Sequence, residues 1–165
     1  MVGSEFYNRV LAVEYAKKYA FVRNSNFSDF TQMGGNCTNF VSQCLLAGGA
    51  QQNYAYPFGW FYKNINSRSP SFTGVEYLYD FLTRKNAVPN SSIGPKAIEC
   101  PIEYLQIGDI VQLSFDGIKF GHSLIVTALN QDDKHNPLLT TNTYDALNKP
   151  LSYYGFAAVR GLCIV

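Results

Sequence analysis

Cys37 is the residue of this chain whose position most clearly suggests chemistry. It opens an apolar run bracketed by glycines, and helical spacing places its side chain on the inward face. Asn36 is a favourable N-cap and Gly48-Gly49 a favourable stop, so Cys37 is predicted in the first turn of a helix. The positive end of the helix dipole there would lower the pKa of the thiol. Cys37 is therefore either an activated nucleophile or a buried structural cysteine.

A thiol nucleophile needs a base, and the chain has two histidines. His135 lies in a polar turn and is predicted to be solvated. His122 lies in a predicted strand, residues 118–128, whose alternation places it on an apolar face. Asn142 alternates with core-facing positions in the next predicted strand, residues 138–143. If a helix packs on this sheet, the thiolate can attack a carbonyl carbon, the imidazole can move the proton, and the third group can orient the ring.

The elements that would position these residues are helices first and antiparallel strands later. Asp116-Gly117 predicts a two-residue hairpin turn between the first two strands. This order gives an α+β architecture, with N-terminal helices packed on an antiparallel sheet in two layers. Helices are expected over residues 7–23, from Cys37 to the Gly48-Gly49 stop, and over 75–85 after a Thr73–Glu76 capping box, and strands over 110–115, 118–128, 138–143 and 157–165.

The 165 residues are the size of a single domain, residues 7–165, after a leader of residues 1–6 that we interpret as vector-derived. A net charge of +1 argues against nucleic acid as the main partner. No apolar run reaches the roughly 18–20 residues of a membrane span. The four cysteines include no Cys-x-x-Cys pair, so no structural zinc site is expected, and pairing of Cys100 with Cys163 stays open.

Two further residues are candidates for substrate contacts. The chain has 12 Tyr, 12 Phe and one Trp, more than a core of this size needs, so some are expected to line a cleft. Trp60 is either a wall of that cleft or a core residue. The backbone N–H of Cys37 is one expected donor of an oxyanion hole, and Gln32 is either the second donor or a solvated loop residue. Gly34 and Gly35 allow this loop to approach a substrate closely.

Longer segments of the chain resemble a known family. Residues Asn36–Gly49 closely resemble the nucleophile motif of the putative amidase-domain family, which belongs to a papain-like group with the NlpC-type and CHAP cell-wall peptidases. The resemblance covers nearly the whole chain, because it continues through residues 7–16, 71–75, 108–112, 121–123, 142–145 and 148–151.

This resemblance implies a papain-like fold, with Cys37 as the nucleophile, His122 as the base, and neither metal nor organic cofactor. It implies bacterial cell-wall peptide (peptidoglycan) as the substrate and an extracellular or cell-wall location. Cys, then His, then Asn is the chain order of papain-like enzymes, which makes Asn142 the third member of the triad. The family usually has Asp where this chain has Asn36, and commonly His where it has Asn142. Asp145 is an alternative residue for orienting the ring.

The sequence is compatible with three functions. The first is a cysteine amidase or endopeptidase that cleaves an amide through a thioester intermediate. The second is an acyltransferase in which the same thiol passes the acyl group to an amine instead of water. The third is a wall- or peptide-binding module with an inactive triad, an interpretation motivated by the departures at Asn36 and Asn142.

Overall fold

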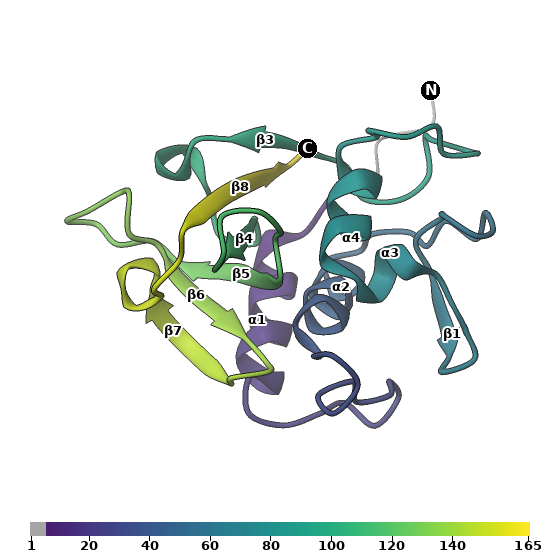
Figure 1. The fold of residues 1–165 in the computed structure, drawn as a ribbon, viewed down its shortest axis with the longest axis horizontal. Helices are drawn as coiled ribbons and strands as arrows, with labels where there is room; N and C mark the ends of the chain where they lie inside the picture. The colour runs from purple at the N-terminus through teal and green to yellow at the C-terminus, as the bar shows by residue number, and fades with distance from the viewer. Residues whose placement is uncertain (1–5) are drawn as a thin grey trace.

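The computed structural model describes residues 6–165 and places helices against a sheet (Figure 1). Residues 1–5 of the interpreted leader lie outside the described residues, and Phe6 is exposed. The predicted α+β class, with N-terminal helices packed on an antiparallel sheet, is confirmed. The helices are α1 (Arg9–Tyr19), α2 (Cys37–Ala47), α3 (Pro70–Thr73) and α4 (Val75–Leu82).

One six-stranded antiparallel sheet forms the second layer, in the spatial order β3-β8-β4-β5-β6-β7. A separate two-stranded antiparallel hairpin lies at the outer edge of the helical side (Figure 1). Within residues 6–165, none of the helices has the length and apolar character to cross a membrane. The strands are β1 (Tyr62–Asn64), β2 (Ser67–Arg68), β3 (Ala97–Cys100), β4 (Ile110–Ser114), β5 (His122–Ala128), β6 (Leu138–Thr141), β7 (Ala146–Pro150) and β8 (Ala158–Ile164), with short 3-10 helices η1 (Ile102–Tyr104) and η2 (Leu151–Tyr153).

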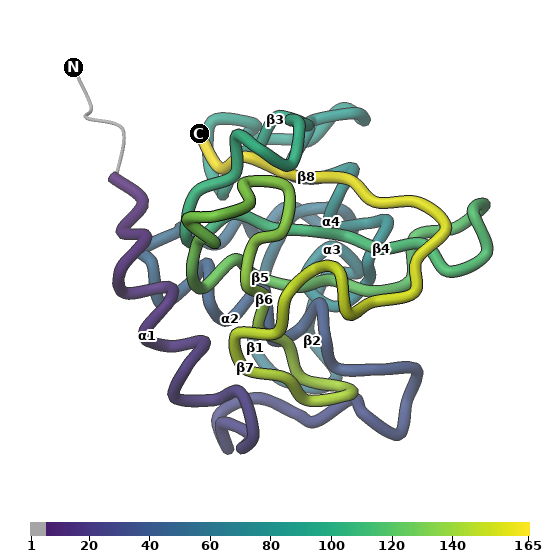
Figure 2. Tube along the Cα trace, turned by 90° about the vertical axis from the view of Figure 1, so that its left-hand side faces the viewer, coloured from purple at the N-terminus to yellow at the C-terminus, as the bar shows by residue number. Residues whose placement is uncertain are grey.

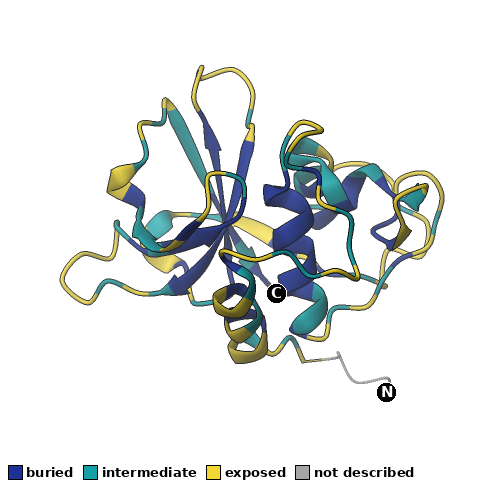
Figure 3. Ribbon diagram, turned by 90° about the horizontal axis from the view of Figure 1, so that it is seen from below, coloured by how far each residue is buried: buried dark blue, intermediate teal, exposed yellow. Residues whose placement is uncertain are grey.

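The sheet buries apolar side chains on both faces, because successive residues of a strand point to opposite sides. Ile110 and Ile125 pack with Phe40 of α2 in one cluster. Val111 and Leu124 belong to a second cluster on the other face. Figure 3 shows this burial in the middle of the sheet and in the neighbouring helix, with the connecting loops largely exposed. The central strands β4 and β5 are therefore held from both sides.

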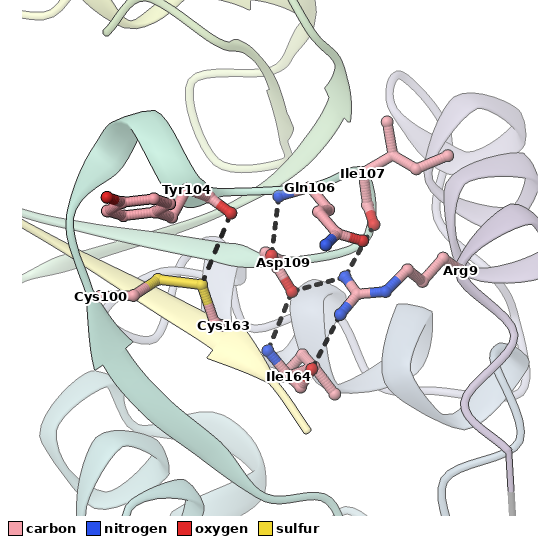
Figure 4. Close-up of a disulfide and its surroundings, with 8 residues drawn as sticks. All are labelled: Arg9, Cys100, Tyr104, Gln106, Ile107, Asp109, Cys163 and Ile164. Atoms are coloured by element: carbon pink, nitrogen blue, oxygen red, sulfur yellow. Dashed lines mark hydrogen bonds and ion pairs between the residues drawn. A yellow bond between two sulfur atoms is a disulfide. The ribbon is translucent and has the colours of Figure 1, made fainter. Parts of the chain in front are cut away.

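Helix α1 runs beside the sheet and is fastened to it by an ion pair (Figures 2 and 4). Arg9 Nη1 donates to Asp109 Oδ1 (2.6 Å), and Arg9 Nη2 donates to the carbonyl of Ile164 (2.8 Å). Asp109 also accepts from the N–H groups of Ile164 (2.9 Å) and Gln106 (2.8 Å). Because its carboxylate is used in this way, Asp109 shapes the turn that opens β4.

The structure pairs two of the four cysteines. Cys100 at the end of β3 and Cys163 in β8 form a disulfide with a Cα–Cα distance of 6.0 Å (Figure 4). It fastens the edge strand β3 to its neighbour β8. Cys37 and Cys44 are free thiols, and both are buried.

The capping box predicted for α4 is wrong. Gly74, not Thr73, is the N-cap, and no side chain of the described residues makes a capping hydrogen bond at this N-terminus. The carboxylate of Glu76 instead accepts from the N–H of Phe120 (3.0 Å) and pairs with Arg160 (3.2 Å). Partners that are distant in sequence take the glutamate away from the helix terminus.

The two-residue hairpin turn predicted at Asp116-Gly117 is also wrong. Residues 115–121 form a loop between β4 and β5. The Asp116 carboxylate holds this loop, because its Oδ1 accepts from the N–H of Ile118 (2.8 Å). His122 is consequently the first residue of β5, at the end of the sheet, instead of lying inside a longer strand.

Candidate active site

Cys37 is the first residue of α2, as predicted, and is only 6% exposed. The preceding loop reaches the helix through Gly34 and Gly35, whose φ angles of 102° and 114° favour glycine. Asn36 is the N-cap residue, but its side chain makes no capping hydrogen bond. The side chain of Asn36 instead forms hydrogen bonds that stabilise the loop preceding Cys37.

Asn36 and Asn142 contact each other, so the two departures from the family pattern fall on one interaction. Asn36 Nδ2 donates to Asn142 Oδ1 (2.7 Å), and Asn142 Nδ2 donates to the carbonyl of Tyr19 (3.3 Å). Asn36 Oδ1 accepts from the N–H of Phe30 (3.1 Å) and from Asn39 Nδ2 (2.9 Å). Position 36 therefore uses both a donor and an acceptor, which an amide has and an ionised carboxylate lacks.

The first turn of α2 is joined directly to the start of β5. The hydroxyl groups of Thr38 and Ser123 are 2.9 Å apart, and both side chains are buried. Burial raises the pKa of the Cys37 thiol, and the backbone N–H of Ser123 offsets part of this rise because it favours the thiolate form. This joint brings the Cys37 sulfur beside the residue that follows His122.

His122 is 5% exposed, and two aromatic side chains lie near its ring. The ring centroids of Phe115 and Tyr154 lie 6.4 Å and 6.3 Å from that of His122. Its Nε2 is buried and has no hydrogen-bond partner among residues 6–165. Burial lowers the pKa of His122 to about 4, so the imidazole is neutral at neutral pH.

The thiol of Cys37 is also neutral at neutral pH. Burial raises its pKa, and the N–H of Ser123 and the hydroxyl of Thr38 offset this rise only in part. The lowered thiol pKa predicted from the helix terminus is therefore wrong for this conformation, because loss of hydration outweighs the helix dipole. No hydrogen bond joins the thiol to the His122 ring within the described part of the chain.

A comparison with known proteins bears on this geometry. The family model described as "Putative amidase domain" matches residues 6–161. The chain belongs to this family. The description of the family suggests hydrolysis of amide bonds.

The chain is also similar to the uncharacterized protein YhbB of Bacillus subtilis (strain 168), with 36% identity over 152 residues. That match covers 89% of this chain and 45% of YhbB, so the chain spans less than half the length of this relative. No solved structure matches the chain.

Within this amidase domain, Asn142 and Asp145 both contact groups other than the His122 ring. Both side-chain hydrogen bonds of Asn142 go to the Cys37 side of the site, to Asn36 and to the end of α1. The carboxylate of Asp145 pairs with Arg23 at 3.0 Å. A role for Asn142 as the third member of a triad stays a prediction.

Trp60 is a core residue of the amidase domain and does not line a cleft. It is fully buried, its ring lies 5.1 Å from that of Phe72, and its Nε1 donates to Ser42 Oγ (3.1 Å). The prediction of substrate contact by Trp60 is therefore wrong. Gln32 is exposed in the turn before Gly34, and its role in an oxyanion hole stays a prediction.

The aromatic surroundings of His122 are not evident from the sequence. Phe115 directly follows β4 and is 55% exposed, while Tyr154 follows η2. The sequence around Phe115 does not indicate this contact, because Asp116-Gly117 predicts a tight turn next to it. Tyr154 is distant from His122 in sequence, so no local pattern connects the two.

Proposed function

We propose that this domain is a cysteine amidase that cleaves amide bonds in bacterial cell-wall peptide, with Cys37 as nucleophile and His122 as base. One observation carries the proposal: the Thr38–Ser123 hydrogen bond fastens the turn bearing the thiol to the strand that begins with the imidazole. Membership of the amidase-domain family supports the reaction class. The resemblance to cell-wall peptidases supports the substrate.

The reaction starts from a neutral thiol and a neutral imidazole. His122 removes the proton of the Cys37 thiol as the sulfur attacks the carbonyl carbon of the amide. The resulting imidazolium gives this proton to the leaving amine when the C–N bond breaks, which leaves a thioester on Cys37. Water then attacks the thioester, with its proton taken by His122, and the carboxylic acid and the thiol are released. In this proposal the N–H of Cys37, at the start of α2, stabilises the oxyanion.

Asn142 has a positioning role in this proposal. It holds Asn36, which precedes Cys37, and the end of α1 in one hydrogen-bonded unit. The residue before the nucleophile is thereby held to the end of α1. The exposed ring of Phe115 beside the base offers an apolar surface to a peptide substrate.

The test is digestion of purified Bacillus subtilis peptidoglycan, with products identified by mass spectrometry. Each cleavage yields a new carboxyl group and a new amine. Cys37→Ala is expected to slow the formation of these cleavage products at least about 10³-fold. Cys44→Ala is the matched control, because Cys44 is buried in the same helix without a role in the reaction. Equal rates for Cys37→Ala and the wild-type protein would contradict the proposal.

A second candidate is a cell-wall-binding module, which is favoured by the raised pKa of Cys37 and by the lack of a hydrogen-bond partner for His122 Nε2 among residues 6–165. Its signature is sedimentation of the protein with peptidoglycan but no new amines for wild type or Cys37→Ala. Acyl transfer is distinguished by adding a primary amine, since transfer forms a new amide instead of a free acid.

A further inference from the structure

We propose that a buried chain of hydrogen-bond donors runs from the guanidinium of Arg160 to the sulfur of Cys37 and favours its thiolate. Gln112, Ser123 and Thr38 are the links of this chain, and they are positioning residues. The functional meaning of this inference rests on the proposed role of Cys37 as nucleophile. The hydrogen-bond chain itself does not depend on that role.

The first link fixes how the Gln112 amide is oriented. Arg160 donates to Gln112 Oε1 from Nε (2.8 Å) and Nη2 (2.6 Å). The guanidinium is held in place between the rings of Tyr79 and Phe120, 3.6 Å and 3.9 Å from their centroids. It also pairs with Glu76 at 3.2 Å. Because a guanidinium can only donate, Oε1 of Gln112 must face Arg160, and its Nε2 must face the other way.

The second link fixes how the Ser123 hydroxyl is oriented. Gln112 Nε2 donates to the carbonyl of Val75 (3.0 Å) and to Ser123 Oγ (3.1 Å). An amide nitrogen has no acceptor capacity, so the Ser123 hydroxyl accepts from it. The single hydrogen of Ser123 is then free to point to Thr38 Oγ1, 2.9 Å away.

The last link ends at the nucleophile. Thr38 Oγ1 accepts from Ser123, and its own hydrogen is left to point to Cys37 Sγ, 3.9 Å away. Gln112 and Ser123 are fully buried, and Thr38 is 1% exposed. In such surroundings, aligned hydrogen bonds polarise one another, and a positive charge at one end strengthens donation at the other. The chain thus opposes the effect of burial on the thiol, and the S···O distance would shorten as the sulfur becomes charged.

The test is the pKa of the Cys37 thiol, measured from the pH dependence of iodoacetamide alkylation mapped by mass spectrometry. Thr38→Val removes the last donor and keeps the shape of the side chain. We expect it to raise the thiol pKa by about one unit and to slow alkylation at neutral pH roughly tenfold. Thr38→Ser keeps the hydroxyl and is expected to restore the wild-type value.

Thr141→Val is the matched control. Thr141 is a buried threonine that also contacts Ser123. Its hydroxyl donates to the Ser123 backbone carbonyl (3.0 Å) and is not part of the hydrogen-bond chain from Arg160 to Cys37. It should leave the thiol pKa unchanged. Equal thiol pKa values for wild type, Thr38→Val and Thr141→Val would overturn the inference. So would equal rises in the two valine variants, because that result indicates general loosening.

Gln112→Glu provides a second variant, and an unchanged thiol pKa in this variant would overturn the proposed direction of the hydrogen bonds even if Thr38→Val does not fold. A carboxylate accepts from Arg160 and also from Ser123, so the Ser123 hydrogen turns away from Thr38. Thr38 then donates its hydroxyl hydrogen to Ser123 and no longer donates to the Cys37 sulfur. The thiol pKa therefore rises. A rise in Gln112→Glu with none in folded Thr38→Val would overturn the chain, because the new charge alone explains it. Since alkylation needs no substrate, this result is independent of whether the domain cleaves peptidoglycan.

Discussion

The thiol side and the imidazole side of the candidate site are built differently. Around Cys37, the polar side chains form two hydrogen-bonded groups, one that joins Asn36 to Asn142 and one that joins Thr38 to Ser123. Around His122, the neighbours are aromatic rings, and Nε2 has no partner within residues 6–165. Hydrogen bonds fix both position and direction, whereas ring packing fixes position less strictly. The thiol side is therefore held more rigidly than the imidazole side, where Nε2 of His122 has no hydrogen-bond partner within residues 6–165.

This difference explains why substitutions should act differently on the two sides. A change on the thiol side breaks buried hydrogen bonds and should cost stability as well as reactivity. A change on the imidazole side removes a polar atom that has no hydrogen-bond partner within residues 6–165, so it should alter chemistry and pH dependence more than folding.

The largest expected effect is on the imidazole side. His122→Ala should slow peptidoglycan cleavage about 10³-fold or more, because the thiol loses its proton acceptor. His135→Ala is the control, since the side chain of His135 is 72% exposed. Release of new amines, measured under identical conditions, gives both rates. Similar rates for the two variants would show that His122 is not the base.

The second prediction concerns stability against pH. Burial lowers the pKa of His122 from 6.5 to about 4, so in this range the unfolded chain binds a proton that the folded chain does not. The free energy of unfolding therefore keeps its full value above pH 6.5. It falls by about 3 kcal/mol in total as the pH decreases to about 4. Urea unfolding across this range measures it. His122→Leu should flatten this dependence and His135→Ala should not; an unchanged slope in His122→Leu would refute the assignment.

The third prediction breaks the thiol side. Asn36→Asp replaces the donor to Asn142 by a second acceptor and buries a charge, so the free energy of unfolding should fall by about 2 kcal/mol. Asn142→His, added to this variant, supplies a new donor and should recover part of the loss. Asn66→Asp at an exposed site is the control and should be nearly neutral. Additive losses in the double variant would mean that the two positions are not coupled.

The smallest effect compares two tyrosine hydroxyls. Tyr154 Oη, beside His122, is buried without a partner in the described chain, whereas Tyr62 Oη donates to Ser28 Oγ (3.0 Å). Tyr154→Phe should therefore stabilise the fold by about 1 kcal/mol, and Tyr62→Phe should destabilise it by a similar amount. Thermal unfolding of the two variants measures the difference. A loss of stability in both would indicate that Tyr154 has a partner after all.

Much of the thiol side could be predicted from sequence, because its determinants are local. Glycines and a continuous apolar period bound the helix that begins at Cys37, and the structure ends it at Ala47, just before Gly48-Gly49. The central strand β4 and the α+β class follow from comparable local patterns. Helix α1, in contrast, ends at Tyr19, short of the predicted residue 23.

The remaining features depend on partners that are distant in sequence. Glu76 has a good capping-box position, but Arg160 and Phe120 claim its carboxylate. Trp60 in an aromatic-rich loop could have been exposed or buried, and only packing on Phe72 decides between them. The pKa of Cys37 was predicted with the wrong sign because the helix terminus is visible in sequence and the extent of burial is not.

The most direct test of the central claim is to trap the acyl-enzyme. Peptidoglycan fragments released by a muramidase are mixed with the protein, the reaction is quenched in acid during turnover, and the intact protein is weighed by mass spectrometry. The account predicts a peptide adduct that maps to Cys37, is removed by hydroxylamine as a thioester, and is absent from Cys37→Ala. Cleavage of amide bonds with no adduct, at a rate that Cys37→Ala retains, would contradict it.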